Sequence, residues 1–393
     1  MKKYLSQTVQ TIPPSGIRKF FDLVSSMDDV ISLGVGEPDF PTPWVMRESA
    51  IYSLEQGQTM YTSNSGLFEL RQELSRYLAK NLSLNYSPTT EILITVGASE
   101  AIDLAMRALI EPGDAILITD PCYVSYAACA QLAGAEIRYV PLRAENDFRL
   151  QEEDLIAAYT PNCKILLLSY PNNPTGAVME RDDLLPVARF VSENDLVVLS
   201  DEIYSDLTYE GTHQPFAGLP YMRNRTLHIS GFSKAYAMTG WRVGYTCGPE
   251  DLIAAMTRIH QYTVMCAPIM GQIAALEGLR TGNVAKQEMV MEYDRRRRIM
   301  VSGFREMGLT CFDPQGTFYV FPDISATGLS SEHFAEKLLQ QQKVAVVPGT
   351  AFGPSGEGHI RCSYAYAPEI LKEALERISR FVAQFVMADT QII

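Results

Sequence analysis

The chain has 393 residues, of which 47% are hydrophobic, 10% aromatic and 20% charged, the balance of an ordinary soluble globular protein. This composition excludes a disordered or fibrous chain. Domains usually hold about 100 to 200 residues, so the length predicts two or three packed units with a cleft between them. The formal net charge of -13 disfavours nucleic acid and anionic membrane surfaces as partners.

The seven cysteines are scattered and never spaced as CxxC, which predicts neither a zinc site nor a disulfide framework. The five histidines also lack paired ligand spacing, so surface or core roles are favoured over metal binding. No segment approaches the ~20 apolar residues of a membrane helix. We therefore expect a soluble protein of the reducing cytoplasm, with no metal and no membrane contact.

The predicted elements begin after an irregular start, because residues 1–45 contain five prolines and show little periodicity. We expect this segment to form an arm that lies over another surface and joins the smaller domain. From about residue 90, short β-branched runs alternate with helical patterns, which is typical of βαβ units. Strands are predicted over 91–96, 115–119, 136–140, 164–169, 196–200, 226–230 and 243–247, with helices such as 99–110, 123–132 and 181–194 between them.

The remaining chain has a different pattern. Residues 284–307 predict one long helix, which ends before Gly308 in the C′ position, and short strands and two further helices follow. The fold class is therefore α/β: residues 46–282 form a large domain with a mostly parallel seven-stranded sheet flanked by helices, and residues 283–393 form a smaller α+β domain. The basic run 295–298 lies inside the long helix and predicts a solvated or salt-bridged face.

Ligands of open α/β sheets bind beyond the carboxyl ends of the strands, where this sequence places polar residues. Ala98 and Ser99 follow the first predicted strand at the start of a helix, which can present backbone N–H groups to an anion. A proline-flanked loop after another strand holds Asn173, and Asp201 directly ends the next strand, with Tyr204 three residues on. Each feature alone also fits a plain structural role as a helix start, a turn or a helix cap.

The segment 230–245 is decisive because it places Lys234 among small and aromatic residues at a strand end. Poor solvation favours the neutral amine, a nucleophile that can form a Schiff base with a carbonyl. Ser233 beside it and Arg242 further on can bind a dianionic phosphate. A lysine with phosphate anchors implies pyridoxal phosphate, whose ring nitrogen needs a carboxylate partner such as Asp201.

From about Pro14 to the end, the sequence resembles the class I/II aminotransferases of the fold-type I pyridoxal-phosphate enzymes. Within them it is most similar to the bacterial aromatic or aspartate aminotransferase branch. The resemblance is carried by the segment 33–40, by Tyr61 with Gly66 and Leu67, by the segment 173–176 and by the lysine loop. These motifs recur in the family's order and at its spacings.

The resemblance implies a role for each of the catalytic candidates. Lys234 corresponds to the lysine that holds the cofactor and then moves a proton between the substrate Cα and the cofactor. Asp201 corresponds to the partner of the pyridine nitrogen, Asn173 and Tyr204 to the two donors to the ring's phenolic oxygen, and Tyr123 to the aromatic side chain that stacks on the ring. A simple core aromatic is the alternative for Tyr123.

The resemblance also implies the anion contacts. Phosphate contacts come from Ala98, Ser99, Ser233 and Arg242, and Tyr61 reaches the phosphate of a neighbouring subunit, which implies a homodimer with shared active sites. The substrate carboxylate is bound by Arg361, by Gly36 and, from the cofactor loop, by Asn173. The role of Ser230 stays open.

The implied activity is an aminotransferase that moves an amino group from an L-amino acid to a 2-oxo acid such as 2-oxoglutarate by a ping-pong mechanism. We find no obvious second arginine for a side-chain carboxylate. Candidates to line an apolar side-chain pocket are Phe20, Phe21, Tyr319 and Phe352, with ordinary core packing as an equal alternative. Aromatic amino acids are therefore favoured as donors, followed by aspartate or alanine.

Two other functions compete with this interpretation. A β-eliminating C–S lyase uses the same fold and cofactor, and a requirement for a 2-oxo acid separates the two activities. A non-catalytic regulator with an aminotransferase-like domain requires a fused DNA-binding domain, for which 393 residues leave no room.

Overall fold

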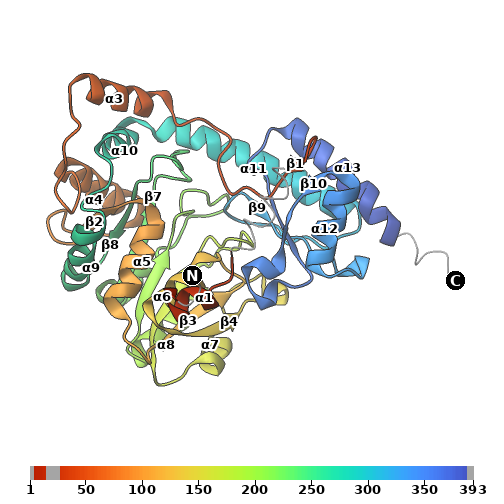
Figure 1. The fold of residues 1–393 in the computed structure, drawn as a ribbon, viewed down its shortest axis with the longest axis horizontal. Coiled ribbons are helices and arrows are strands. Elements are labelled where there is room, and N and C mark those ends of the chain that lie inside the picture. Colours follow the sequence, from red (N-terminus) through yellow and green to blue (C-terminus); the bar gives the residue numbers. More distant parts are fainter. Residues whose placement is uncertain (1–3, 15–26, 387–393) are drawn as a thin grey trace.

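The structure is a computed structural model that describes residues 4–14 and 27–386. Its centre is a seven-stranded sheet in the order β2-β8-β7-β6-β5-β3-β4 (Figure 1). The pairings are parallel except those of β8, which runs antiparallel to both of its neighbours. The predicted α/β class and all seven strands are confirmed. The strands are β2 (Ile92–Thr95), β3 (Ala115–Asp120), β4 (Glu136–Pro141), β5 (Cys163–Ser169), β6 (Val197–Asp201), β7 (Thr226–Gly231) and β8 (Gly244–Cys247).

Helices cover both faces of this sheet, which is why its strands read as nearly continuous apolar runs. Ile165 and Leu167 of β5 belong to a buried cluster with α5 and α9, whereas Leu166 and Leu168 belong to a separate cluster with α8. The helices of this unit are α3 (Trp44–Glu55), α4 (Phe68–Leu82), α5 (Gly97–Leu109), α6 (Ser125–Ala133), α7 (Glu152–Ala158), α8 (Arg181–Glu193), α9 (Glu250–Thr263) and α10 (Ile269–Thr281).

A second, smaller α+β unit follows, coloured cyan to blue in Figure 1. The long helix α11 (Asn283–Glu306) begins and ends one residue earlier than predicted, and Gly308 follows it with φ +85°, the left-handed conformation expected at C′. A three-stranded antiparallel sheet has the order β11-β12-β9. The elements after α11 are β9 (Tyr319–Val320), α12 (Ser331–Gln342), β10 (Val344–Ala345), β11 (Val347–Pro348), β12 (Ile360–Ser363) and α13 (Pro368–Val386).

The N-terminal segment contacts both units. Helix α1 (Gln7–Thr11) lies against α6, and β1 (Ile31–Ser32) pairs in parallel with β10 of the smaller unit. The pairing agrees with an arm that joins the smaller domain. The domain boundaries at residues 45 and 282 stay predictions.

The basic run in α11 is a salt-bridged face, as predicted. Arg296 and Arg297 are 4% exposed, and they bind Asp39 and Asp313 respectively, at 2.8 and 3.0 Å. Arg295 and Arg298 form ion pairs with carboxylates of the same helix.

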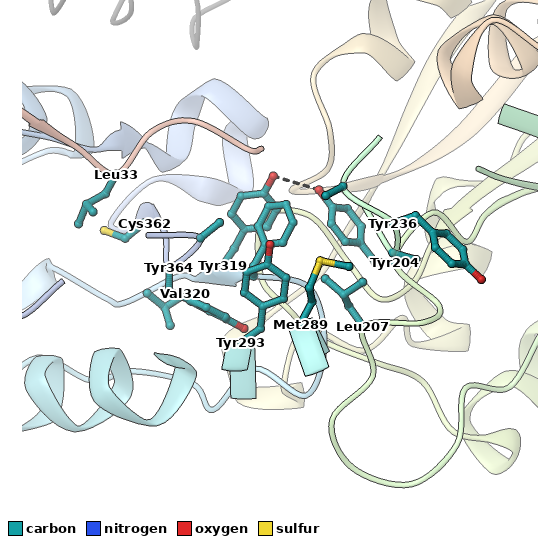
Figure 2. Close-up of a cluster of buried hydrophobic side chains, with 14 of the residues drawn as sticks. Leu33, Tyr204, Leu207, Tyr236, Met289, Tyr293, Tyr319, Val320, Cys362 and Tyr364 are labelled. Atoms are coloured by element: carbon teal, nitrogen blue, oxygen red, sulfur yellow. Dashed lines mark hydrogen bonds between the residues drawn. The ribbon is translucent and has the colours of Figure 1, made fainter. Parts of the chain in front are cut away.

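A shared core holds the two units together. Figure 2 shows Leu33 of the arm, Tyr204 of the large unit, and Tyr319 and Cys362 of the small sheet packing in one buried cluster with Tyr293 of α11. The small sheet therefore packs against the loops at the carboxyl ends of the large sheet. None of the described helices combines the length and apolarity that a membrane span requires.

Candidate active site

A cavity of about 640 Å³ opens where the large sheet, the small sheet and the arm meet. This volume lies in the range of about 300–1,000 Å³ that is usual for small-molecule sites. All but one of the residues expected to act in catalysis, cofactor binding or binding of the substrate carboxylate line it: Gly36, Ala98, Ser99, Tyr123, Asn173, Asp201, Tyr204, Ser233, Lys234, Arg242 and Arg361. The exception is Tyr61, which lies between α3 and α4 and is 80% exposed.

Lys234 follows β7 and points toward the arm. Its Nζ donates a hydrogen bond to the Gly36 carbonyl at 2.6 Å and lies 5.6 Å from the centroid of the Phe318 ring. Burial, followed by the positive charge of Arg361, lowers the pKa of Lys234 to about 8. The direction of this shift agrees with the expectation of a poorly solvated amine.

Asp201 ends β6 and is fixed on both carboxylate oxygens. Oδ2 accepts a hydrogen bond from the Tyr126 hydroxyl at 2.7 Å, and Oδ1 accepts one from the Ile203 backbone N–H at 3.2 Å. Burial raises the pKa of Asp201 to about 6. Tyr126 was missed from the sequence, although it lies three residues after Tyr123, a spacing that brings two side chains together at a helix start. Their rings meet edge to face at 5.6 Å.

An anion-binding corner forms where β2 runs into α5. The first turn of α5 contains Ala98 and Ser99, whose N–H groups lie at the positive end of the helix. The Arg242 guanidinium packs so closely on Gly97 that a Cβ there would lie 2.4 Å from its Nη2. A Cβ on Gly244 would lie 2.4 Å from the Gly97 carbonyl carbon. Glycine at both positions therefore lets the guanidinium and β8 approach the helix start.

Arg361 comes from β12 and is 2% exposed. Its Nη1 donates to Asn173 Oδ1 at 2.9 Å and its Nη2 to the Gly34 carbonyl at 2.7 Å. The guanidinium lies over the Tyr319 ring at 4.2 Å and the Phe352 ring at 4.6 Å. Its Nε is buried and has no hydrogen-bond partner among the described residues.

The candidates for an apolar pocket do not all reach the cavity. Tyr319 lines it and hydrogen-bonds the Tyr204 hydroxyl at 3.0 Å. Phe352 is 3% exposed, packs in the core below Arg361 and is absent from the lining, so the core-packing alternative holds for this residue. Phe20 and Phe21 lie outside the described residues.

Ser230, whose role the sequence left open, does not line the cavity. Its hydroxyl is buried and donates to the Glu202 carbonyl at 3.2 Å. This hydrogen bond joins the ends of β6 and β7 next to the loops that carry Asp201 and Lys234. Ser230 therefore supports these loops from behind.

The lining fits pyridoxal phosphate in three respects. A buried amine of lowered pKa is present for the aldehyde, a hydrogen-bonded carboxylate for the ring nitrogen, and a corner of guanidinium, hydroxyl and N–H groups for the phosphate. The close approach of Arg242 to the Gly97 backbone shows that this corner is a packed cradle. No group of side chains in the described parts of the chain is placed to hold a metal ion.

The cavity thus brings together one buried lysine, one fixed carboxylate and two arginines, a set that can hold pyridoxal phosphate and a carboxylate substrate. Aminotransferase class I and II is the family that matches residues 28–378, and the chain belongs to it. It is an aminotransferase, and members of this family use pyridoxal phosphate.

Individual relatives cover almost the whole chain. "Putative aminotransferase YugH" of Bacillus subtilis is 53% identical over 97% of this chain and 99% of its own. An aspartate aminotransferase of Pyrococcus abyssi is 42% identical over 97% and 98%. The crystal structure of an aromatic aminotransferase from Pyrococcus horikoshii has a TM-score of 0.89 at 42% identity, over 94% of this chain and 99% of that one. These relatives give no support to the C–S lyase alternative.

Proposed function

We propose that this aminotransferase uses aromatic L-amino acids as its preferred donors, pyridoxal phosphate as its cofactor and a 2-oxo acid as its acceptor. Some relatives are named for aspartate and others for aromatic substrates, so we choose between these donors from the residues that line the cavity. Among the described residues, its cations are Lys234, Arg242 and Arg361. Each of the three is assigned to the cofactor or the α-carboxylate.

The remaining lining favours an apolar side chain. It includes Val35, Ile203 and the Tyr319 ring, together with the carboxylate of Glu37. A second substrate carboxylate would find no further cation in the part of the lining that the structure describes, and Glu37 would repel it. This is the observation that supports an aromatic donor over aspartate. The side-chain carboxylate of 2-oxoglutarate would also lack a cation and meet the charge of Glu37. Acceptors therefore have to be compared as well as donors.

The cofactor assignment gives each polar residue a task. When bound, pyridoxal phosphate supplies an aldehyde that condenses with amines and a ring that delocalises the electron pair left after Cα deprotonation. Arg242, Ser233 and the first-turn N–H groups of α5 would hold the phosphate, and Asp201 would keep the ring nitrogen protonated. Lys234 Nζ, neutral above about pH 8, accepts the proton from the substrate Cα.

The substrate is oriented from the other side of the cavity. Arg361 binds the α-carboxylate, and Asn173 holds the guanidinium in plane through their hydrogen bond of 2.9 Å. The Gly36 carbonyl holds the Lys234 amine on the same side.

We further propose a homodimer in which Tyr61 completes the partner's site. Tyr61 is 80% exposed, Met60 before it 75%, and Trp44 and Tyr52 on the adjoining helix α3 are 56% and 60% exposed. Exposed apolar side chains of this density mark a protein interface, and a second copy presents the same surface. Sedimentation should show a dimer. A monomer that retains full cofactor affinity would contradict the shared site.

We also assign the enzyme to the cytoplasm. All seven cysteines are free thiols, and five of them are buried. Free thiols persist in a reducing compartment, which supports this assignment.

The deciding experiment is a panel of initial rates for phenylalanine, tyrosine, alanine, lysine and aspartate, with 2-oxoglutarate, pyruvate and phenylpyruvate as acceptors. We expect kcat/KM for the aromatic donors to exceed that for aspartate by about tenfold or more, a difference of about 1.4 kcal/mol. Glu37→Gln should bring the kcat/KM for aspartate closer to that for the aromatic donors, because it removes the charge that repels the aspartate side chain. Faster turnover of aspartate by the wild-type enzyme would overturn the aromatic assignment, and a protein without visible absorbance from a lysine-bound cofactor would overturn the cofactor assignment.

A further inference from the structure

Glu100 brings a negative charge to the helix start where the phosphate is expected. It lies in the first turn of α5, directly after Ala98 and Ser99, yet it is not part of the cavity lining. A carboxylate in the first turn is attracted to the same positive helix end as a phosphate, so the two anions compete. Phosphate binding at the start of α5 therefore depends on where the Glu100 carboxylate is held.

Two hydrogen bonds hold the Glu100 carboxylate in place. Oε2 accepts the backbone N–H of Val96 at 2.5 Å, and Oε1 lies 2.8 Å from Nδ1 of His260 on α9. Since a carboxylate only accepts, the imidazole nitrogen donates. Val96 is the N-cap residue of α5 and has no side-chain capping group, so Glu100 takes over part of the capping.

His260 has no other described polar partner for its side chain. The residue is completely buried, and its Nε2 has no hydrogen bond within residues 4–14 and 27–386. Burying an unpaired ring nitrogen costs free energy that an apolar side chain of similar size would avoid. The hydrogen bond to Glu100 is thus the only one that the His260 ring makes within the described residues.

The same turn of α9 also fixes the segment that carries Tyr61. The His260 carbonyl accepts the N–H groups of Val264 and Met265, both at 3.0 Å. The Met265 carbonyl in turn accepts the Asn64 amide at 2.8 Å. Asn64 lies three residues after Tyr61. His260 therefore lies between two parts of the chain that we assign to phosphate binding.

We propose that His260 is a positioning residue for the cofactor phosphate: it holds the Glu100 carboxylate against the Val96 side of the helix start and keeps that charge out of the anion corner. The proposal rests on the proposed function, because it takes the corner to be the phosphate site. Without the imidazole donor, the carboxylate is released toward the corner and repels a dianion. The defect should therefore depend on the phosphate group and on the charge of Glu100.

The test compares pyridoxal phosphate with pyridoxal, which lacks the phosphate. Apo-enzyme is titrated with each compound, and binding is measured by absorbance and tryptophan fluorescence. For His260→Leu we expect a Kd for pyridoxal phosphate about tenfold higher than wild type, while the Kd for pyridoxal changes less than about twofold. His260→Asn, which keeps an N–H donor near the position of Nδ1, should recover most of the affinity.

A second variant isolates the charge. Adding Glu100→Gln to His260→Leu should restore the affinity for pyridoxal phosphate, because the repelling charge is gone. Equal losses for the two compounds, or a double variant as weak as His260→Leu, would overturn the proposal. If leucine at 260 prevents folding, His260→Met removes the donor with another apolar side chain and serves the same comparison.

Calorimetric titration with inorganic phosphate separates this inference from the proposed function. Wild-type protein that never attaches pyridoxal phosphate would contradict the proposed function, and phosphate binding would still show whether His260 and Glu100 control the anion corner. Unchanged phosphate affinity in His260→Leu would contradict the inference even in a fully active aminotransferase.

Discussion

The phenolic oxygens of Tyr204 and Tyr319 lie 3.0 Å apart and share a hydrogen bond (Figure 2). Tyr319 also lies under the Arg361 guanidinium, whose centre is 4.2 Å from the ring centroid. One side chain thus connects the residue assigned to the cofactor's ring oxygen with the residue assigned to the substrate carboxylate. Gly36 limits its position from the arm, since a Cβ there would lie 2.1 Å from the Tyr319 hydroxyl.

Gly36→Ala should therefore displace Tyr319. Forced overpacking costs about 1–3 kcal/mol, so we expect kcat/KM to fall by about tenfold, with visible absorbance of the bound cofactor retained. Tyr319→Phe removes the oxygen that clashes and leaves the next ring atom 3.2 Å from the added methyl group. The double variant should accordingly be more active than Gly36→Ala alone. If the losses in kcat/KM of the two single variants simply multiply in the double variant, the added methyl group does not act through the Tyr319 hydroxyl.

Tyr126→Phe should weaken the hold of Asp201 on the cofactor. The lost hydroxyl donates to Asp201 at 2.7 Å, and its hydrogen bond favours the ionised carboxylate. Without it, the pKa of Asp201 rises further above about 6, so less carboxylate is ionised near neutral pH. Cofactor affinity should fall about tenfold, and more steeply as the pH drops from about 8 to about 6.

Ser169→Ala is the matched control for this prediction. It removes the other partner of the Tyr126 hydroxyl, at 3.0 Å, and leaves the contact with Asp201 in place. Its cofactor affinity should stay within about twofold of wild type. A pH-independent loss in Tyr126→Phe would indicate a packing defect instead.

The low pKa of Lys234 predicts how covalent attachment depends on pH. Only the neutral amine attacks an aldehyde, so the attachment rate of pyridoxal phosphate to apo-enzyme should rise with pH and reach half its plateau at about 8. Removing the nearby positive charge with Arg361→Gln should move this midpoint upward. Stopped-flow absorbance measures the attachment rate at each pH. A wild-type midpoint near 10.4, the usual pKa of lysine, would show that the amine is solvated.

How far the sequence predicts this molecule depends on the range of the interactions involved. The seven strands and Gly308 follow from local patterns, and the residues at the strand ends follow from the rule that parallel strands end at one edge. The place of Glu37 in the lining and the His260 contact with Glu100 could not be predicted in this way. His260 and Glu100 are 160 positions apart, and only the packing of α9 on α5 brings them together.

Phe352 shows a choice that the sequence left open. The sequence offered it either as a pocket wall or as a core residue, and the structure packs its ring beneath Arg361. Aromatic type alone does not distinguish a ring that lines a pocket from one that supports the residue that does.

Gly244→Ala tests whether the anion corner depends on close backbone packing. The new Cβ would lie 2.4 Å from the Gly97 carbonyl carbon and 2.5 Å from the Ala98 nitrogen, and neither backbone atom can move without shifting the first turn of α5. We expect a loss of about 1–3 kcal/mol in unfolding free energy and weaker binding of inorganic phosphate. Gly218→Ala is the control, because its Cβ would meet its nearest neighbour at an ordinary 3.4 Å. Thermal unfolding and phosphate titration of both variants measure the difference. If Gly244→Ala binds phosphate as wild type does, the first turn of α5 is not the site of the anion.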